Sequence, residues 1–383
     1  MVIVHLNKRG VDKVRRGHLW IYKDEVKKVE AEDDVGVANV FFEDEFIGRA
    51  LYNAKAKNVL KMLTRTYKEI DENFFVERFE AALKRRRVLR TKFRREFNAE
   101  GDFIPSLVID RFDTTFVVQI RSRALEELKE DIVSAMVKVY DPLTIYERSD
   151  FESMPEEGLS RYKGVLYGLH PTTEIVTEKG IKFKVDVVHG QKTGFFFDQR
   201  DSRAFVKGIS FRGGKALDLF TYTGGFALSM ASCGMKVDAV DISQDDLDIA
   251  SQNAKMNKLK VNFINADAFD LKNFGTYDLI IADPPSLVKK KSERERAYQL
   301  VKGLVDQILD HLRDGGRFGF CSCAYNIDRE MLKRAVSKSA SEKGKWVRVL
   351  GWTGLPIDHP HLMSMPETDY LKCLWCEAGD NVL

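Results

Sequence analysis

The sequence predicts a multidomain α/β protein of three parts joined by one connecting helix. Short, closely spaced runs of alternating apolar residues open the chain, a mixed pattern of strands and one helix follows, and strand–helix alternation begins after about residue 173. Short strands at close spacing favour a small barrel or sandwich, whereas strand–helix alternation is typical of a parallel sheet with helices on both faces. We expect boundaries at residues 1–70, 71–102, 103–172 and 173–383, the second range being a basic linker helix.

The first 70 residues contain four runs that we expect to be strands, because apolar and polar residues alternate in them between glycines and acidic turns. These runs are Val2–Leu6, Val37–Phe42, Phe46–Leu51 and Leu60–Leu63. Arg15 and Arg16 stand close to an aromatic stretch that contains Trp20. Because clustered basic residues displace condensed counterions from phosphates, these three residues are candidates for contacts with a nucleic acid.

Apolar residues recur at helical spacing over residues 71–97, which predicts a helix. Its second half, residues 84–95, is the densest basic run of the chain and includes Lys84, Arg85 and Arg86. A solvated linker helix and a helix that contacts phosphates both have this composition. The run by itself favours neither interpretation strongly.

Residues 103–172 predict a small α+β domain. The segment Leu125–Tyr140 has the apolar stripe of an amphipathic helix, and Asp141-Pro142 ends it. The expected strands are Leu107–Asp110, Phe116–Ile120, Thr144–Glu147 and Gly164–Leu169.

The third part alternates apolar runs, bounded by turn residues, with amphipathic segments. The expected strands are Ala216–Phe220, Lys236–Asp241, Val261–Asn265, Leu279–Ala282 and Arg317–Cys321. The expected helices are Gly225–Cys233, Asp245–Met256, Arg296–Leu312 and Arg329–Ala340. This order predicts a parallel sheet covered on both faces.

Polar residues stand at the carboxyl ends of these expected strands, at the edge where open α/β sheets bind ligands. The segment Asp218–Phe226 follows the first strand, and its Gly224 and Gly225 allow a tight turn close to a ligand. Asp241 ends the second strand, about 20 residues later, where a carboxylate binds both hydroxyls of a ribose.

Two further strand ends complete the pattern. Asp267 follows the third strand, where its carboxylate is placed to accept a hydrogen bond from an exocyclic amine, and Asp283-Pro284-Pro285 follows the fourth. One such feature alone is more often a turn or a helix cap, but caps alone hardly explain four on successive strands. The G-x-G-x-x-G sequence of a nicotinamide-binding domain is absent.

Residues 214–323 resemble the class I S-adenosylmethionine-dependent methyltransferases, with Phe220 and Tyr222 where the broad class usually has glycine. In these two residues the chain resembles one subgroup, the bacterial 23S rRNA cytosine-C5 methyltransferases of the large-subunit methyltransferase I family. Other segments that resemble this subgroup span nearly the whole chain. They are His18–Tyr22, Ile109–Phe112, Tyr146–Asp150, His189–Arg203, Thr221–Phe226, Cys321–Cys323, Asp358–Pro360 and Tyr370–Lys372.

The resemblance implies an N-terminal PUA β-barrel, a small α+β middle domain and a C-terminal Rossmann-like class I methyltransferase domain. It also implies S-adenosyl-L-methionine as the cofactor and ribosomal RNA (23S or its precursor) as the partner. The residues expected at the cofactor are Phe197, Arg200, Asp218, Phe220, Tyr222, Thr223, Gly224, Gly225, Asp241, Ile242, Ser243, Asp267, Ala268, Asp283, Pro284 and Pro285. Those expected at the RNA are Arg15, Arg16, Trp20, Lys84, Arg85, Arg86, Lys289 and Lys290.

Cytosine C5 is a poor nucleophile until a group adds at C6, and a thiolate suits this addition because sulfur attacks near neutral pH and leaves again. The resemblance implies Cys323 as the nucleophile and Asp283 as the acid that assists at N3. Cys321 lies two positions earlier, on the same face of an extended strand, so whether it shares this role stays open. Ser286 follows the proline pair, where a second cysteine or a stacking aromatic residue would indicate other chemistry.

The composition excludes several classes of protein. No apolar run approaches the ~20 residues of a membrane helix, and the N-terminus lacks the apolar core of a secretory signal. Five cysteines in 383 residues are too few for a disulfide framework, so we expect a cytoplasmic protein, and their spacing favours no metal site. The alternative functions are methylation of another RNA or atom, and RNA binding without catalysis. The oligomeric state stays open, with a homodimer among the alternatives.

Overall fold

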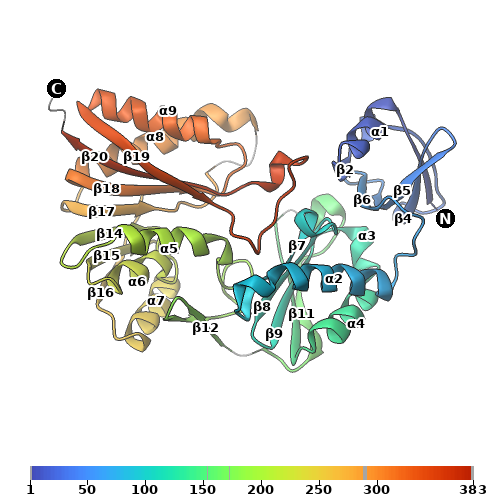
Figure 1. Cartoon of the computed structure of the whole chain (residues 1–383), viewed down its shortest axis with the longest axis horizontal. Coiled ribbons are helices and arrows are strands. Elements are labelled where there is room, and N and C mark those ends of the chain that lie inside the picture. Colours follow the sequence, from blue (N-terminus) through green and yellow to red (C-terminus); the bar gives the residue numbers. More distant parts are fainter. Residues whose placement is uncertain (1, 153, 172, 288–290, 381–383) are drawn as a thin grey trace. The chain divides into compact units, whose positions relative to one another are not determined.

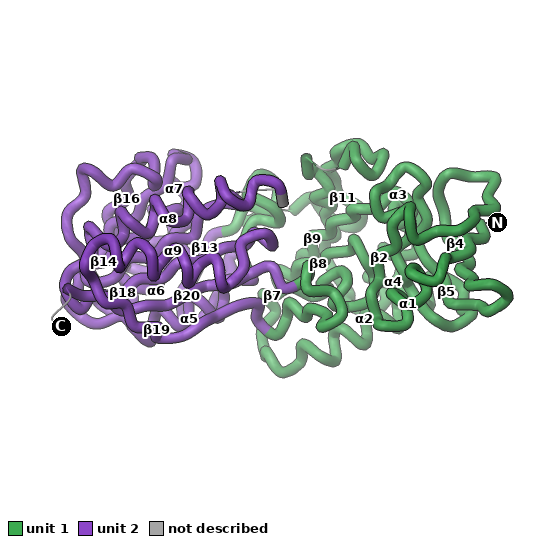
Figure 2. Tube along the Cα trace, turned by 90° about the horizontal axis from the view of Figure 1, so that it is seen from above, with its two compact units in different colours: residues 1–174, 185–197, 357–368 green, residues 175–184, 198–356, 369–383 purple. Residues whose placement is uncertain are grey.

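The computed structural model describes residues 2–152, 154–171, 173–287 and 291–380 of the chain (Figure 1). The chain divides into two compact units, which are described separately (Figure 2). Unit 1 comprises residues 1–174, 185–197 and 357–368, and unit 2 comprises residues 175–184, 198–356 and 369–383. Residues 173–174, 185–197 and 357–368 of the expected third part therefore belong to unit 1. In the described part of the chain, no helix is long and apolar enough to cross a membrane.

A six-stranded sheet opens unit 1, with the strand order β2-β6-β5-β4-β1-β3. Its strands are β1 (Val2–Leu6), β2 (Trp20–Ile21), β3 (Val26–Glu30), β4 (Val35–Phe42), β5 (Glu45–Asn53) and β6 (Leu60–Thr64). The four strands expected here are confirmed. The short helix α1 (Lys8–Arg15) was not expected, because its apolar face consists of little more than Val11 and Val14. The side chain of Asn7 caps this helix by accepting a hydrogen bond from the Gly10 amide.

A second, five-stranded sheet of unit 1 has the order β11-β10-β9-β8-β7 and packs against helices. Its strands are β7 (Phe93–Asn98), β8 (Leu107–Phe112), β9 (Thr115–Ile120), β10 (Thr144–Ser149) and β11 (Tyr162–Gly168). Its helices are α2 (Glu72–Arg86), α3 (Arg123–Glu126) and α4 (Lys129–Tyr140). The core of this layer joins Phe75 and Phe79 of α2 to Phe116 of β9 and Met136 of α4.

The expected helix over residues 71–97 is wrong in its second half. Helix α2 begins after its cap Asp71, whose side chain accepts from the Phe74 amide, but it ends at Arg86. The residues from Phe93 to Asn98 form strand β7 instead. The alternation of this strand is hidden in the sequence, because Arg94 and Glu96 point inward and are buried as an ion pair.

Unit 2 is built on a seven-stranded sheet of order β16-β15-β14-β17-β18-β20-β19. Its strands are β14 (Lys215–Leu219), β15 (Lys236–Asp241), β16 (Val261–Asn265), β17 (Tyr277–Ala282), β18 (Leu312–Ser322), β19 (Lys345–Gly354) and β20 (Lys372–Asp380). Its helices are α5 (Arg200–Ile209), α6 (Gly225–Ala231), α7 (Gln244–Met256), α8 (Arg294–His311) and α9 (Arg329–Glu342), and a hairpin of β12 (Glu174–Glu178) and β13 (Ile181–Val185) precedes them. Strands β14 to β18 pair in parallel, as expected, and β20 joins β18 antiparallel.

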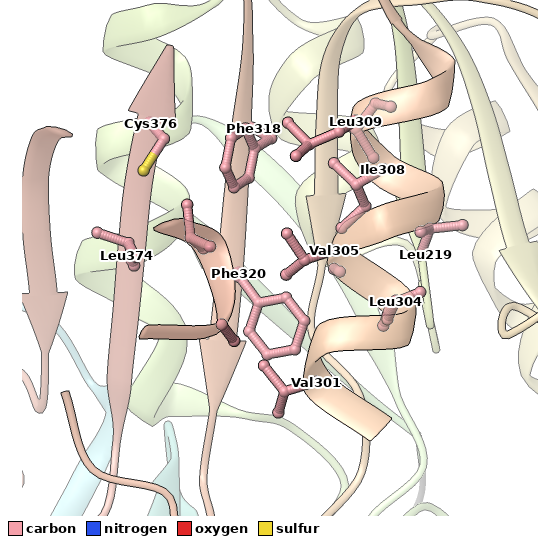
Figure 3. Packing of buried hydrophobic residues seen from close by; sticks show 14 of the residues in the cluster. Leu219, Val301, Leu304, Val305, Ile308, Leu309, Phe318, Phe320, Leu374 and Cys376 are labelled. Carbon is pink, nitrogen blue, oxygen red and sulfur yellow. The ribbon is translucent and has the colours of Figure 1, made fainter. Parts of the chain in front are cut away.

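Helices cover both faces of this sheet, because alternate residues of its strands point to opposite sides. On one side, side chains of α8 pack against Phe318 and Phe320 of β18 (Figure 3). On the other side, Leu279 and Ile281 of β17 share a core with α5 and α6. Since the parallel strands all run in one direction, their carboxyl ends meet at one edge of the sheet.

Candidate functional site

The carboxyl ends of β14, β15, β17 and β18 bring the predicted polar residues to one edge. Leu219 pairs with Val240 on one side and Ala282 on the other, and Ala282 pairs with Phe320. Asp241, Asp283 and Cys321 follow these positions by one residue each. The site is thus a row across neighbouring strand ends, as the sequence pattern predicts.

The loop after β14 turns sharply around the buried Asp218. The carboxylate Oδ2 of Asp218 accepts hydrogen bonds from Thr221 Oγ1 at 2.6 Å and from the Ala227 amide at 2.8 Å. Gly224 has φ +89°, in the left-handed region that glycine adopts without strain. Phe220 and Tyr222 also have positive φ, of 63° and 51°, so the backbone is held in an unusual conformation.

Asp218 also has one carboxylate oxygen without a partner. Its side chain is fully buried, and Oδ1 accepts no hydrogen bond from any residue that the structure describes. Burial raises the pKa of this carboxyl from its ordinary value of 3.8 to about 7, while Thr221 and the Ala227 amide act in the opposite direction. A buried acceptor beside a tight loop fits a ligand that donates a hydrogen bond or carries positive charge.

Asp241 ends β15 and faces the same loop. Its Oδ2 accepts from the Tyr222 amide at 2.8 Å and its Oδ1 accepts from the Ser243 amide at 3.0 Å. Each carboxylate oxygen has a second lone pair, so two hydroxyl donors can still bind there. Ile242 is 75% exposed, which leaves an apolar surface next to this carboxylate. A ribose with an attached base fits this arrangement.

The third strand end contributes less than expected. Asp267 is exposed, and its Oδ1 accepts from the Phe269 amide at 2.9 Å. The ring of Phe269 lies 4.9 Å from that of Phe220, which links this turn to the loop after β14. Ala268 is 3% exposed and belongs to the core of unit 2, and its cofactor contact stays a prediction.

Asp283 is held by a residue that the sequence did not single out. Gln199 Nε2 donates to Asp283 Oδ2 at 2.9 Å, and Gln199 is 4% exposed. Pro284 is buried and Pro285 is exposed, which places the proline pair at the rim of the strand end. The segment His189–Arg203 contains Gln199, so its similarity to the family motif was the available indication.

The two candidate cysteines have different surroundings. Cys321, within β18, is fully buried and forms a disulfide with Cys373 of β20, whereas Cys323 lies just past the end of β18 and is partly exposed. This pair departs from the reduced state that the cysteine count suggested, but it joins facing residues of adjacent strands and is no framework of loop cross-links. Cys323 is therefore the better placed thiol for a reaction. Among the described residues, no cluster of possible metal ligands is present.

Known proteins are similar to this chain over nearly its whole length. The chain is 34% identical to the ribosomal RNA large subunit methyltransferase I of Pseudoalteromonas translucida, over 96% of this chain and 98% of that protein. It is also 34% identical to the Vibrio parahaemolyticus protein of the same name, over 98% and 99% of the two chains. The chain belongs to the ribosomal RNA large subunit methyltransferase I family.

The parts of this methyltransferase match known domains. Residues 4–65 match the PUA-like domain, and residues 165–348 match the S-adenosylmethionine-dependent methyltransferases. Two solved structures share the fold over 98% of this chain and 100% of theirs, each at 23% identity. One, from Streptococcus mutans, is assigned as a SAM-dependent methyltransferase and has a TM-score of 0.84. The other is assigned as a methyltransferase complexed with SAH and has a TM-score of 0.85. The predicted PUA and Rossmann-like domains and the predicted cofactor are confirmed.

The strand-end residues of the methyltransferase fit this cofactor. When bound, S-adenosylmethionine supplies an electrophilic methyl group. Asp241 is placed to hold the ribose hydroxyls and the exposed Ile242 the adenine face. The Oδ1 of Asp218, which has no partner among the described residues, fits a ligand that brings its own donors.

Two residues predicted for the cofactor pack elsewhere in the methyltransferase. Phe197 is 1% exposed, and its ring packs against Phe112 within unit 1, so its cofactor contact stays a prediction. Arg200 is buried and pairs with Glu178 at 3.4 Å. Arg203 binds the same carboxylate at 2.6 Å. Burial alone would raise the pKa of Glu178, but these two guanidinium groups outweigh it and lower the pKa.

The residues predicted for RNA divide into exposed and buried ones. Arg15, Arg16, Lys84 and Arg85 are exposed, as phosphate contacts require. Arg86 is 1% exposed and binds the buried carboxylate of Asp102, so its predicted RNA contact is wrong. Trp20 is half-buried, with its indole N–H donating to Glu100 Oε1 at 3.0 Å. Lys289 and Lys290 lie outside the described residues.

The raised pKa of Asp218 predicts a pH-dependent stability. A carboxyl whose pKa is raised on folding contributes stability that is fully present below about pH 4 and is lost as the pH rises through about 7. Asp218→Asn keeps a neutral side chain of the same shape at every pH. Between pH 5 and pH 8, we therefore expect the parent to lose about 2–3 kcal/mol of unfolding free energy that the variant keeps. Urea unfolding followed by tryptophan fluorescence measures this difference, and parallel pH curves for the two proteins would contradict it.

Proposed function

We propose that this methyltransferase forms 5-methylcytosine in large-subunit ribosomal RNA, in 23S rRNA or its precursor, and that it acts in the cytoplasm. The relatives' names supply the RNA class. The observation that supports the chemistry is the partly exposed Cys323 at the end of β18, beside the strand end of Asp283. A thiol next to a carboxyl group at the cofactor edge suits addition to a pyrimidine ring.

The reaction follows from the roles of these two residues. The Cys323 thiolate adds to C6 of cytosine, forming an S–C6 bond, while Asp283 donates a proton or hydrogen bond at N3, where negative charge develops. C5 thereby gains enamine character and takes the methyl group from the cofactor. A base then removes the C5 proton, the S–C6 bond breaks and frees the Cys323 thiolate, and any proton placed on N3 returns to Asp283.

The surroundings of these groups favour one cysteine acting alone. Cys321 is fully buried in its disulfide, so its sulfur is not a nucleophile in this state. Ser286, after the proline pair, is exposed and has neither a thiol nor an aromatic ring to stack on a base. These residues support C5 chemistry over methylation of an exocyclic amine.

The exposed basic residues of unit 1 support an RNA substrate. Arg15 and Arg16 lie at the end of α1, and Lys84 and Arg85 lie in the last turn of α2. Contacts of this kind bind the phosphate backbone without reading its sequence. The nucleotide to be methylated must therefore be selected by other contacts.

The test is mass mapping of modified nucleosides in large-subunit rRNA from a deletion strain and its parent. We expect one 5-methylcytosine to disappear on deletion and to return with the intact gene, but not with a Cys323→Ala gene. If every 5-methylcytosine persists, the proposed target is wrong, and loss of a different methylated nucleoside would reassign the atom. Absence of saturable SAH binding in calorimetry would favour an RNA-binding protein without catalysis.

A further inference from the structure

A buried lysine lies beside the proposed nucleophile. Lys372 is the first residue of β20, is 5% exposed and pairs in register with Ser322 of β18. Its Nζ donates to the carbonyl oxygen of Ala324 at 2.9 Å. Ser322 and Ala324 are the two neighbours of Cys323, so Lys372 is linked to one of them by strand pairing and to the other through its ammonium group.

A disulfide fixes the two strands at this point. Cys373, the residue after Lys372, is bonded to Cys321, two residues before Cys323. The Cα atoms of the pair are 4.0 Å apart. This cross-strand bond holds the start of β20 against the end of β18. The position of Lys372 relative to Cys323 is therefore set by covalent structure as well as by strand pairing.

The charges around Lys372 indicate an electrostatic partner. Burial lowers the pKa of Lys372, while negative charge on Asp369, Cys323 and Asp328 acts in the opposite direction. Arg329 adds to the lowering. A buried ammonium is costly unless it is paired, so each of these anions matters.

Asp328 is already engaged by other groups. Its carboxylate accepts from Arg294 at 2.5 Å and caps α9 by accepting from the Met331 amide at 2.8 Å. Asp369 acts on Lys372 as well, and of the three anions only the thiolate of Cys323 takes part in the proposed reaction. Coulomb energy belongs to the pair, so a thiolate that stabilises the ammonium is stabilised by it to the same extent.

We propose that Lys372 is a positioning residue that stabilises the thiolate form of Cys323. This inference rests on the proposed role of Cys323 as nucleophile. Lys372 stays protonated throughout the reaction. The thiol proton of Cys323 leaves to solvent, and the thiolate forms the S–C6 bond. When that bond breaks, the ammonium group again stabilises the thiolate. Thiolates next to lysine are formed at lower pH than isolated ones.

A purely structural role for Lys372 has to be separated from this one, since its Nζ also holds the Ala324 carbonyl. Lys372→Met removes both the charge and the donor. Lys372→Gln removes the charge but keeps an N–H donor, and Lys372→Arg keeps the charge. A structural role predicts that Gln resembles the parent, whereas an electrostatic role predicts that Gln resembles Met.

The readout is the pH dependence of Cys323 alkylation by iodoacetamide, with the modified peptide identified by mass spectrometry. A Cys233→Ser background removes a second accessible thiol, and burial raises the pKa of Cys376 to about 12, which keeps it unreactive near neutral pH. For Lys372→Met and Lys372→Gln we expect the pH midpoint of Cys323 alkylation to rise by about one pH unit. For Lys372→Arg we expect the same midpoint as in the parent. SAH binding by calorimetry verifies that each variant is folded.

An unchanged midpoint in a folded Met or Gln variant would overturn the proposal. If neither neutral variant binds SAH, the Arg variant decides, because a raised midpoint in a protein that keeps the charge contradicts an electrostatic role. The alkylation needs no RNA. The alkylation midpoint could rise in the neutral Lys372 variants while the deletion strain keeps every 5-methylcytosine of its rRNA. That result would support the Lys372–Cys323 pair and reject only the proposed substrate.

Discussion

Replacing Cys323 by alanine is expected to abolish methyl transfer. Without the sulfur, no group adds at C6 and C5 stays a poor nucleophile, so we expect kcat to fall by at least about a thousand-fold. Binding of SAH should be unchanged, because Cys323 lies past the end of β18 and outside the loops around Asp218 and Asp241. Transfer of labelled methyl groups to rRNA fragments measures the first quantity, and calorimetry measures the second.

RNA that contains 5-fluorocytosine makes the same experiment specific for the sulfur atom. Fluorine at C5 cannot leave as a proton does, so the S–C6 adduct persists after methyl transfer. The parent protein should form a complex that survives denaturing electrophoresis, and Cys323→Ala should form none.

Cys321→Ala is the matched control for this experiment. It removes a buried sulfur two residues away and opens the disulfide to Cys373, yet the adduct should still form. If trapping is lost in the Cys321 variant and kept in the Cys323 variant, the nucleophile is Cys321.

The strand-end residues could be predicted from the sequence because the fold imposes their position. Alternation of strands and helices fixes a parallel sheet, and in such a sheet every carboxyl end lies at one edge. Asp218, Asp241 and Asp283 stand at those ends. A correct prediction of the strands therefore also predicts that these residues lie at the edge of the sheet. Local pattern and topology sufficed here, without any knowledge of side-chain contacts.

Buried charge could not be predicted in the same way. A basic run is normally solvated, and nothing in residues 84–95 distinguishes the exposed Lys84 from the buried Arg86. The difference is the partner Asp102, which is reached only after α2 and the following strand have been folded together. Strand β7 was missed for the same reason, since the ion pair of Arg94 and Glu96 replaces the apolar alternation that marks a strand.

The residues that support the reacting groups are also long-range features. Gln199 reaches Asp283 across 84 positions of sequence, and Lys372 reaches Ala324 across 48. Periodicity carries no information about such pairs. Both residues do lie in segments that resemble the family motifs, so the resemblance marked the segments while the structure supplied the contacts.

Asp241→Ala is expected to weaken the binding of the cofactor more than the other substitutions do. The proposed ribose contacts are hydrogen bonds to a charged group, each worth about 1.5–3 kcal/mol, so losing two weakens binding by roughly 10²- to 10⁴-fold. Part of this loss arises in the protein itself, because the Tyr222 and Ser243 amides lose their acceptor as well. Calorimetric titration with SAH measures the affinity, and Asp241→Asn, which keeps one acceptor oxygen, should lose less.

Asp245→Asn provides the control of equal charge change for this prediction. Asp245 is exposed in the first turn of α7, four residues from Asp241, so its variant should bind SAH as the parent does.

The kinetics of the Asp241 variant separate cofactor binding from the chemical step. Asp241 is proposed to bind the cofactor and lies three strands from the proposed reacting sulfur, so its alanine variant should raise KM for S-adenosylmethionine and keep most of kcat at saturation. A low kcat at saturating cofactor would mean that Asp241 also orients the methyl group, because orientation changes the rate of a bound complex whereas affinity alone does not.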